Sequence, residues 1–483
     1  MNGNKPFLHK PAEFRSRFTQ RIAEHSRVAY LPLPKSDLLV LMVIDEMLVT
    51  ADALKLKNSV FQQLKSNADH AGTIHSSGLD DIEVWRLKKT PGKLSVPDVA
   101  FQVWEARKLL GKNSPMASHI APNHVLVASP NYHSCPFGPP EVPPSGIGTP
   151  GLGDGGDVHV TVIDSGFVTG GPIDGRVCYD FGYWFTRDTT APGGYAWVQE
   201  PMVYPNTANP LDQNDDCELD ALVGHANFVA GVIAQGCPTA TIDIVSHNGS
   251  FVENDSGGVP DTPITTEASV AKSLYDVLTR PNPPDLVNVG FAFPTLPVNA
   301  KLGLPNGPPS WSFRSVLDRT KDSRTLIVAP AGNQNTTVKQ YPAAMHETFP
   351  NRVIGVGSVH RHDNGFVKSH FSNHGGWVAC CTSGEDVVSA FVTWSGPTEE
   401  AETSGPDTGT RPKKDFQDWA MWDGTSFAAP KVVAAIAKRM SAPAGIVAGV
   451  PASPLAAWNG VKQGKPSPAD LNMGILLGAL PPT

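Results

Sequence analysis

Three short motifs in the second half of the chain carry residues that could perform acyl transfer. VTVIDSG ends an apolar run with Asp164, GHANFVAG places His225 at the start of a helical run, and DGTSFAAP places Ser426 at the start of another. A hydroxyl nucleophile requires a base within hydrogen-bond reach, and the base requires a carboxylate that holds its tautomer. The three residues therefore predict a triad in which Ser426 attacks, His225 transfers the proton and Asp164 orients His225.

Each of these residues has an ordinary structural interpretation when it is taken alone. An Asp after a strand commonly stabilises a turn, and a Ser before a helix commonly caps it. The order Asp, His, Ser separates the joint pattern from α/β-hydrolases, which run Ser, acid, His, and from chymotrypsin-like enzymes, which run His, Asp, Ser. A lipase-type nucleophile elbow would also require G-x-S-x-G, and this chain has Ala428 in place of the second glycine.

With these motifs in this order, residues 157–440 resemble the catalytic domain of the subtilisin-like serine proteases. The resemblance implies that Asn333, in TLIVAPAGNQ, supplies a side-chain amide to the oxyanion hole, together with the backbone N–H of Ser426. It implies a protein or peptide as the substrate, held as an extended strand. It also implies two stretches that flank the main specificity pocket: Gly290, Phe291 and Ala292 in the first, and Pro330, Ala331 and Gly332 in the second.

The chain departs from the family pattern at two places. Ala226, Asn227 and Phe228 stand where the family usually has Gly, Thr and His, although His225 is kept, and we expect activity to survive. Phe291 and Phe293 stand in the substrate-pairing stretch, where their bulk is expected to narrow the cleft. The calcium loop that many members insert after the catalytic His has no counterpart here, so that site is not predicted.

An acidic stretch separates Asp164 from His225. It contains Asp212, Asp215, Asp216, Glu218 and Asp220. The simplest interpretation is a solvated loop, and the alternatives are an oxygen-ligand metal site or a rim that attracts basic substrates. No zinc motif occurs, and GLGDGG at 151–156 precedes a strand instead of linking a strand to a helix. We expect neither a metal nor a cofactor.

Composition excludes several classes of protein. Apolar residues make up 40% of the 483 residues and charged residues 17%, with a net charge of −8 and no Lys/Arg block, so nucleic acid is not an expected partner. The longest apolar run, 38–44, is far shorter than the roughly 20 residues of a membrane span. The first thirty residues show no signal-peptide core, which favours the cytoplasm and leaves secretion by another route open. Six cysteines indicate no disulfide framework.

The pattern of apolar runs predicts an α/β fold in four parts. Residues 1–134 are expected to form a small α+β domain of ferredoxin-like type, because strand-like runs near 38–44, 81–88 and 124–130 alternate with helical runs at 52–68 and 97–110. Residues 135–156, rich in Pro and Gly, are expected to form a mobile linker. Residues 157–440 are expected to form a parallel sheet with helices on both faces. Residues 441–483 are expected to be a weakly structured tail.

The N-terminal domain and the overall activity each leave alternatives open. The domain loosely resembles the inhibitory propeptides of subtilases, which makes it a possible inhibitor of its own chain, and a permanent recognition domain is the competing interpretation. The leading function is a serine endopeptidase that is self-processing and of narrow specificity. The alternatives are a catalytically silent module that binds peptides and an acyl-transfer peptide ligase.

Overall fold

The computed structural model describes seventeen segments of the chain. They are residues 28–32, 39–50, 68–69, 82–87, 120–127, 137–146, 151–181, 183–187, 195–199, 210–212, 217–220, 222–247, 264–295, 309–363, 365–398, 413–441 and 452–480.

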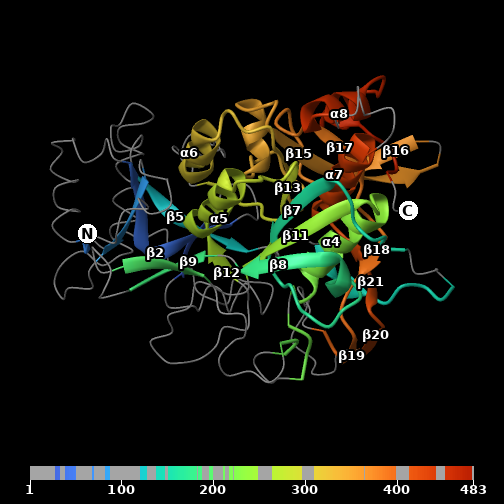
Figure 1. Cartoon of the computed structure of the whole chain (residues 1–483), viewed down its shortest axis with the longest axis horizontal. Helices are drawn as coiled ribbons and strands as arrows, with labels where there is room; N and C mark the ends of the chain where they lie inside the picture. Colours follow the sequence, from blue (N-terminus) through green and yellow to red (C-terminus); the bar gives the residue numbers. More distant parts are fainter. Residues whose placement is uncertain are drawn as a thin grey trace.

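A nine-stranded sheet forms the centre of the larger part of the protein (Figure 1). Its strands run in the order β22 (Ile475–Leu476), β17 (Cys380–Ser383), β15 (Val353–His362), β14 (Leu326–Pro330), β13 (Leu286–Val289), β7 (Val158–Asp164), β11 (Ala240–Ser246) and β8 (Val177–Phe181), with β16 (Gly365–Lys368) beside β15. Every pair is parallel except β15 with β16. The predicted parallel sheet is therefore confirmed.

Helices cover both faces of this sheet. On one face lie α4 (His225–Gly236), α7 (Thr425–Ser441) and α8 (Pro454–Lys462), and on the other lie α5 (Glu267–Thr279) and α6 (Trp311–Arg319). The side chains of β7 show why two layers form, because Val160 and Val162 belong to the core beside α4 and α7, whereas Ile163 belongs to the core beside α5. Successive strand residues point to opposite faces, so an almost wholly apolar strand must be covered on both sides.

The N-terminal region contributes a second, antiparallel sheet, drawn in blue and cyan in Figure 1. Its strands are β1 (Val28–Pro32), β2 (Leu39–Thr50), β3 (Ala68–Asp69), β4 (Ile82–Leu87) and β5 (Ile120–Val127). The order is β5-β2-β4-β3, with β1 beside β2. The three predicted strands are present, and the helices predicted at 52–68 and 97–110 fall, apart from Ala68 in β3, outside the described residues.

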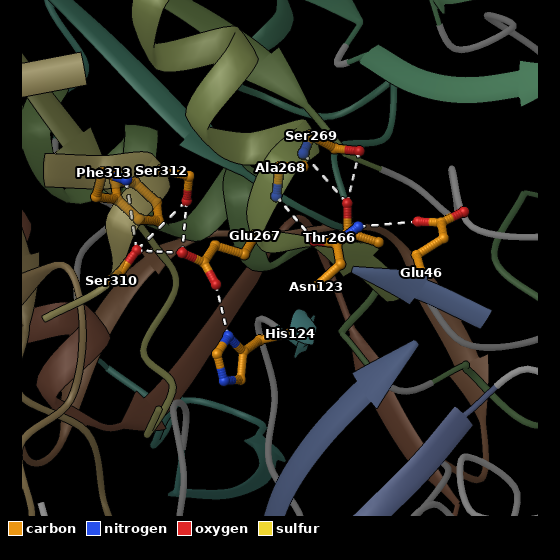
Figure 2. Close-up of polar contacts among 10 residues, drawn as sticks. All are labelled: Glu46, Asn123, His124, Thr266, Glu267, Ala268, Ser269, Ser310, Ser312 and Phe313. Carbon is orange, nitrogen blue, oxygen red and sulfur yellow. Dashed lines mark hydrogen bonds and ion pairs between the residues drawn. The ribbon is translucent and has the colours of Figure 1, made fainter. Parts of the chain in front are cut away.

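The two sheets are joined through a strand that immediately precedes α5. Strand β12 (Ile264–Thr266) pairs antiparallel with β5 and so extends the N-terminal sheet by one strand. Figure 2 shows the polar contacts at this junction. Asn123 Oδ1 accepts a hydrogen bond from the backbone N–H of Ala268 at the start of α5 at 3.2 Å, while its Nδ2 donates to Glu46 at 2.9 Å. An N-terminal strand thus supplies a cap to a helix that covers the parallel sheet.

Glu267 lies at the centre of the junction in Figure 2. Its Oε2 is 2.5 Å from Nδ1 of His124 on β5, and its Oε1 accepts hydrogen bonds from the hydroxyls of Ser312, at 2.5 Å, and Ser310, the N-cap residue of α6. Glu267 is 1% exposed and His124 3%. One buried carboxylate therefore links the N-terminal sheet to the first turns of α5 and α6.

Two expectations about irregular segments differ from the structure. Within 135–156, β6 (Phe137–Glu141) pairs with β21 (Trp419–Asp423) in a three-stranded sheet completed by β18 (Val387–Ala390), and Lys414 Nζ donates to the Glu141 carboxylate at 2.8 Å. That part of the predicted linker is an ordered strand. The backbone hydrogen bonds of β6 come from β21, which lies far away in the chain, so the local Pro- and Gly-rich sequence gives no sign of the strand.

The predicted weakly structured tail is likewise ordered where the structure describes it. Helix α8 begins after Ser453, whose hydroxyl accepts from the N–H of Ala456, and it buries Trp458 against the core beside α7. Strand β22 then joins the edge of the sheet beside β17. The short helix has a modest apolar face, and its stability comes from packing on α7, which local periodicity does not reveal.

The smaller strand pairs are β9 (Tyr183–Arg187) with β10 (Tyr195–Gln199), and β19 (Trp394–Gly396) with β20 (Lys414–Phe416). In the described segments no helix is long and apolar enough to cross a bilayer. The five described cysteines form no disulfide.

Candidate active site

Asp164 and His225 form a buried hydrogen-bonded pair at the carboxyl end of the sheet. Asp164 ends β7 and His225 begins α4, and Nδ1 of His225 lies 2.8 Å from Oδ1 of Asp164. Both side chains are 0% exposed. The same carboxylate oxygen accepts the backbone N–H of Ser165 at 2.7 Å. The bond to Nδ1 leaves Nε2 as the imidazole nitrogen for proton transfer.

The backbone of Gly290 lies very close to the second carboxylate oxygen of Asp164, Oδ2. Gly290 follows β13 and donates its N–H to the carbonyl of Ile163 at 2.9 Å, which places it directly beside the end of β7. A Cβ atom at Gly290 would lie 2.1 Å from Oδ2 of Asp164, far inside any real contact distance. The absence of a side chain at this position therefore allows Asp164 to keep its orientation.

Replacing Gly290 by alanine is expected to lower kcat/KM by about 100-fold, because the new methyl group must displace the Asp164 carboxylate or the end of β13. The measurement is peptide hydrolysis alongside a thermal unfolding curve. The matched control is Gly376→Ala, since a methyl group at Gly376 would meet no atom within 4 Å and the backbone there has no positive φ. Equal activity of both variants would show that the close approach to Asp164 is irrelevant.

Ser426 lies in the first turn of α7, with Gly424 at a φ of 155° making the turn from β21 into the helix. It is 1% exposed. The ring of its neighbour Phe427 packs 5.5 Å from the His225 ring, and Trp422 meets that ring edge-on at 5.8 Å. Within the described segments, Ser426 Oγ and His225 Nε2 have no hydrogen-bond partner, so α4 and α7 pack together without a Ser–His hydrogen bond in this structure.

Asn333 is held against the residue that precedes Ser426. Its Oδ1 accepts two hydrogen bonds from Thr425, one from the backbone N–H at 2.9 Å and one from the hydroxyl at 2.8 Å. The Thr425 hydroxyl in turn accepts the N–H of Gly332 at 3.0 Å. Because both bonds engage the carbonyl end of the amide, the orientation of its NH₂ group is fixed relative to the start of α7.

Comparison with known proteins connects this arrangement to one family. The profile of the subtilase family, Peptidase_S8, matches residues 155–452, which is more than half of the chain. The chain belongs to the subtilase family. Two of the predicted residues, Asp164 and His225, are hydrogen-bonded to each other. Asn333 is hydrogen-bonded to Thr425, the residue before Ser426, and all four predicted residues lie within the matched region.

Individual relatives are more distant. A subtilisin-like proteinase of Encephalitozoon cuniculi is 37% identical over 83 residues, 17% of this chain, and the match spans only 14% of that protein's length. Among solved structures, fervidolysin from Fervidobacterium pennivorans, a keratinolytic enzyme related to subtilisin, is 16% identical with a TM-score of 0.49, covering 91% of this chain and 62% of that chain. A cold-adapted subtilisin-like serine proteinase is 20% identical with a TM-score of 0.39, covering 68% of this chain and 91% of that chain.

The unusual residues after His225 are accommodated by this subtilase in two ways. Asn227 forms a two-point clamp, because its Oδ1 accepts the N–H of Val168 at 3.0 Å and its Nδ2 donates to the Val168 carbonyl at 2.7 Å. This clamp ties α4 to the loop that follows Asp164. Phe228 is buried and packs 4.4 Å from the ring of Phe427, which lies beside Ser426. Sequence reasoning identified these positions as departures and did not identify their role in holding the site.

The two stretches expected to flank the specificity pocket lie at the ends of neighbouring strands. Residues 290–292 follow β13, and residues 330–332 end β14 and lead to Asn333. Phe291 is fully buried in the core beside α5, with its ring 5.9 Å from the His247 ring, and Phe293 packs beside Phe313. The aromatic bulk of this stretch thus occupies the apolar layer on the α5 and α6 side.

The acidic stretch is only partly described. Asp212 and Asp220 are buried, and Oδ2 of Asp212 accepts the N–H of Cys217 at 2.9 Å. Asp215 and Asp216 lie outside the described residues. Among the residues that are described, no group of three or more His, Cys, Asp and Glu side chains is arranged to hold a metal ion.

Two ionisable groups near α7 have shifted pKa values. Burial raises the pKa of Asp423 to about 6; the hydrogen bond from the Asp386 N–H opposes this shift, and the carboxylates of Asp386, Glu385 and Glu141 add to it. Burial lowers the pKa of Lys431 to about 8, and its ammonium donates to the Ser383 hydroxyl at 3.1 Å. Both groups therefore change their protonation state near neutral pH.

Proposed function

We propose that this subtilase is a serine endopeptidase that hydrolyses peptide bonds through an acyl-enzyme. The observation that carries the proposal is the buried 2.8 Å hydrogen bond between Asp164 and His225, with Ser426 in the first turn of the helix that packs on α4. An Asp–His pair whose other imidazole nitrogen has no hydrogen-bond partner in the described part of the chain fits the role of a general base.

In the proposed reaction Ser426 Oγ attacks the peptide carbonyl carbon while its proton passes to Nε2 of His225. The resulting imidazolium is stabilised by the carboxylate of Asp164. The carbonyl oxygen becomes an oxyanion, which the amide of Asn333 and the N–H of Ser426 stabilise. His225 then gives its proton to the leaving amine, and water hydrolyses the ester through the same steps in reverse order. Substrate binding is expected to bring Ser426 and His225 into hydrogen-bond contact.

A catalytically silent binding module is the second candidate, and the missing Ser–His hydrogen bond favours it. Such a protein would keep the fold and bind an extended peptide without cleaving it. Hydrogen bonds in a catalytic centre are often poorly aligned before the substrate binds, so the endopeptidase remains the stronger proposal.

We also propose that the N-terminal region inhibits the catalytic region until a cut between about 130 and 157 separates them. The support is the direct attachment of the N-terminal sheet to the catalytic region, through the pairing of β12 with β5 and the cap that Asn123 gives to α5. A recognition domain that stays attached is the alternative, since the same contacts would serve a permanent assembly.

A single experiment tests both proposals. Intact-mass spectrometry of the full chain and of Ser426→Ala, each with and without a fluorophosphonate probe, is expected to show one probe adduct on the parent and none on the variant. A cut between about 130 and 157 in the parent alone would support self-removal, and labelling without a cut would support a retained domain. Absence of both, even after residues 1–150 are removed by an added protease, would favour the silent module.

A further inference from the structure

Gln340 lies beside a backbone bridge that links the stretch after β13 to the stretch after β14. It precedes Tyr341, whose backbone exchanges two hydrogen bonds with Phe293, at 2.8 and 3.2 Å. Gln340 itself is 0% exposed. The bridge between Phe293 and Tyr341 therefore brings Gln340 to the stretch that follows β13.

Gln340 also lies against the stretch that follows β14. A Cβ atom at Gly332 would lie 3.3 Å from Cγ of Gln340, so the two residues are in side-by-side contact. The last described ladder pair between β13 and β14 is Asn288 with Val328, and beyond it the two chain stretches continue without a further pair. Gln340 thus lies next to both the stretch that follows β13 and the stretch that follows β14.

The amide of Gln340 is buried with both of its polar atoms unsatisfied. Among the residues that the structure describes, neither Nε2 nor Oε1 has a hydrogen-bond partner. The nearby amide of Asn373 is fully used, because its Nδ2 donates to Ala331 and Gln334 and its Oδ1 accepts from two backbone N–H groups. Burying an amide without hydrogen-bond partners is unfavourable, so such a side chain points to a ligand that completes it.

The expected path of the substrate places one of its side chains at this position. The attacked carbon lies at Ser426, its oxygen lies toward Asn333, and its leaving nitrogen lies toward His225, which stands beside β7. The remaining direction, toward the acyl part of the substrate, runs over the ends of β13 and β14, which lie between the end of β7 and β15 in the sheet. The side chain of the residue that supplies the attacked carbonyl is therefore expected to lie beside residues 290–292 and 330–332, where Gln340 also lies.

We propose that the Gln340 amide binds this side chain, and that the favoured substrates carry a carboxamide there, as glutamine or asparagine. The inference rests on the proposed peptidase function. A carboxamide offers one donor group and one acceptor, which matches both unsatisfied atoms of Gln340. A charged side chain would lose its hydration here, and the ammonium of the adjacent Lys339 is already paired with Glu347. An apolar side chain would leave the amide unsatisfied.

The test compares kcat/KM for peptide substrates that differ only in this residue, with glutamine, methionine, glutamate or lysine. The parent is expected to cleave the glutamine substrate at least fivefold faster than each of the others. Gln340→Met keeps the length of the side chain and removes the amide, and it is expected to bring the ratio of glutamine to methionine substrate below one. Gln340→Glu serves as a second variant. It is expected to lose the preference for the glutamine substrate and to show a higher kcat/KM for the lysine substrate than the parent.

Labelling of Ser426 by a fluorophosphonate separates failure of the inference from failure of the proposed function. A chain that labels and cleaves with a preference below fivefold, or with a preference that both variants leave unchanged, would overturn the role of Gln340. A chain that neither labels nor cleaves would overturn the peptidase proposal, and the inference with it. The substrate series on the parent remains decisive even if a variant does not fold.

Discussion

Replacing Asp164 by asparagine is expected to lower kcat/KM by about 10⁴-fold while the fold is retained. Asp164 Oδ1 holds Nδ1 of His225 at 2.8 Å, and both side chains are fully buried. An asparagine of the same shape can present an NH₂ group to Nδ1, which would favour the tautomer with its proton on Nε2. That imidazole cannot accept the Ser426 proton, and the charge of its protonated form would have no counter-charge.

The loss should appear mainly in kcat and should be measured with peptide substrates near neutral pH. A second Asp–His pair in the same sheet provides the matched control, since Oδ2 of Asp243 on β11 lies 2.6 Å from Nε2 of His159 on β7. This pair is partly exposed and lies away from the carboxyl ends of the strands. Asp243→Asn is therefore expected to change kcat/KM by less than about twofold. A comparable loss in both variants would mean that the effect is one of general stability.

The catalytic region was predictable because its determinants are local. Strand β7 and helices α4 and α7 each follow from a local run of side chains in the motifs of Asp164, His225 and Ser426, and the alternation of strands with helices predicts a parallel sheet with these residues at one edge. The contact between Asp164 and His225 follows from that arrangement. The structure places them as the sequence predicts, and their catalytic roles stay predictions.

What the sequence did not reveal depends on contacts between distant segments. The clamp of Asn227 on Val168 requires α4 to lie beside the loop after β7, and an isolated amide in a helix gives no sign of it. Gln340 likewise lies in a stretch without periodicity; only the folded structure shows that it is buried beside Gly332 and that neither polar atom of its amide has a partner among the described residues. Helix α8 and strand β6 are stabilised by elements far away in the chain, which explains why both segments looked irregular.

Replacing Glu267 by glutamine is expected to reduce the free energy of unfolding by about 3 kcal/mol near pH 7, because a buried carboxylate that accepts hydrogen bonds from three side chains is replaced by an amide that cannot satisfy all of them. Glu267 joins His124 on the N-terminal sheet to Ser310 and Ser312 at the start of α6. A glutamine of the same size presents one oxygen and one NH₂ group where two carboxylate oxygens now accept three hydrogen bonds. The measurement is urea unfolding of the full chain.

The pH dependence of this contribution follows from the pKa of Glu267. Burial alone would raise that pKa, but His124 and the two serine hydroxyls outweigh burial, so it lies below its ordinary value. A carboxyl group whose pKa is lowered by folding contributes stability in full above its unfolded pKa, about 4.3, and loses it as the pH falls through the lower folded value. The difference in stability between the parent and Glu267→Gln is therefore expected to shrink below about pH 4.5, as the Glu267 carboxylate becomes protonated.

An exposed carboxylate on the neighbouring helix provides the control for this prediction. Asp318 pairs with Arg314 at 3.5 Å, with both side chains 56% exposed, and Asp318→Asn is expected to change stability by less than about 0.5 kcal/mol at every pH. If Glu267→Gln were as stable as the parent at pH 7, the buried carboxylate would not hold the junction. If the difference persisted unchanged to pH 3, the titrating group that stabilises the junction would be one other than Glu267.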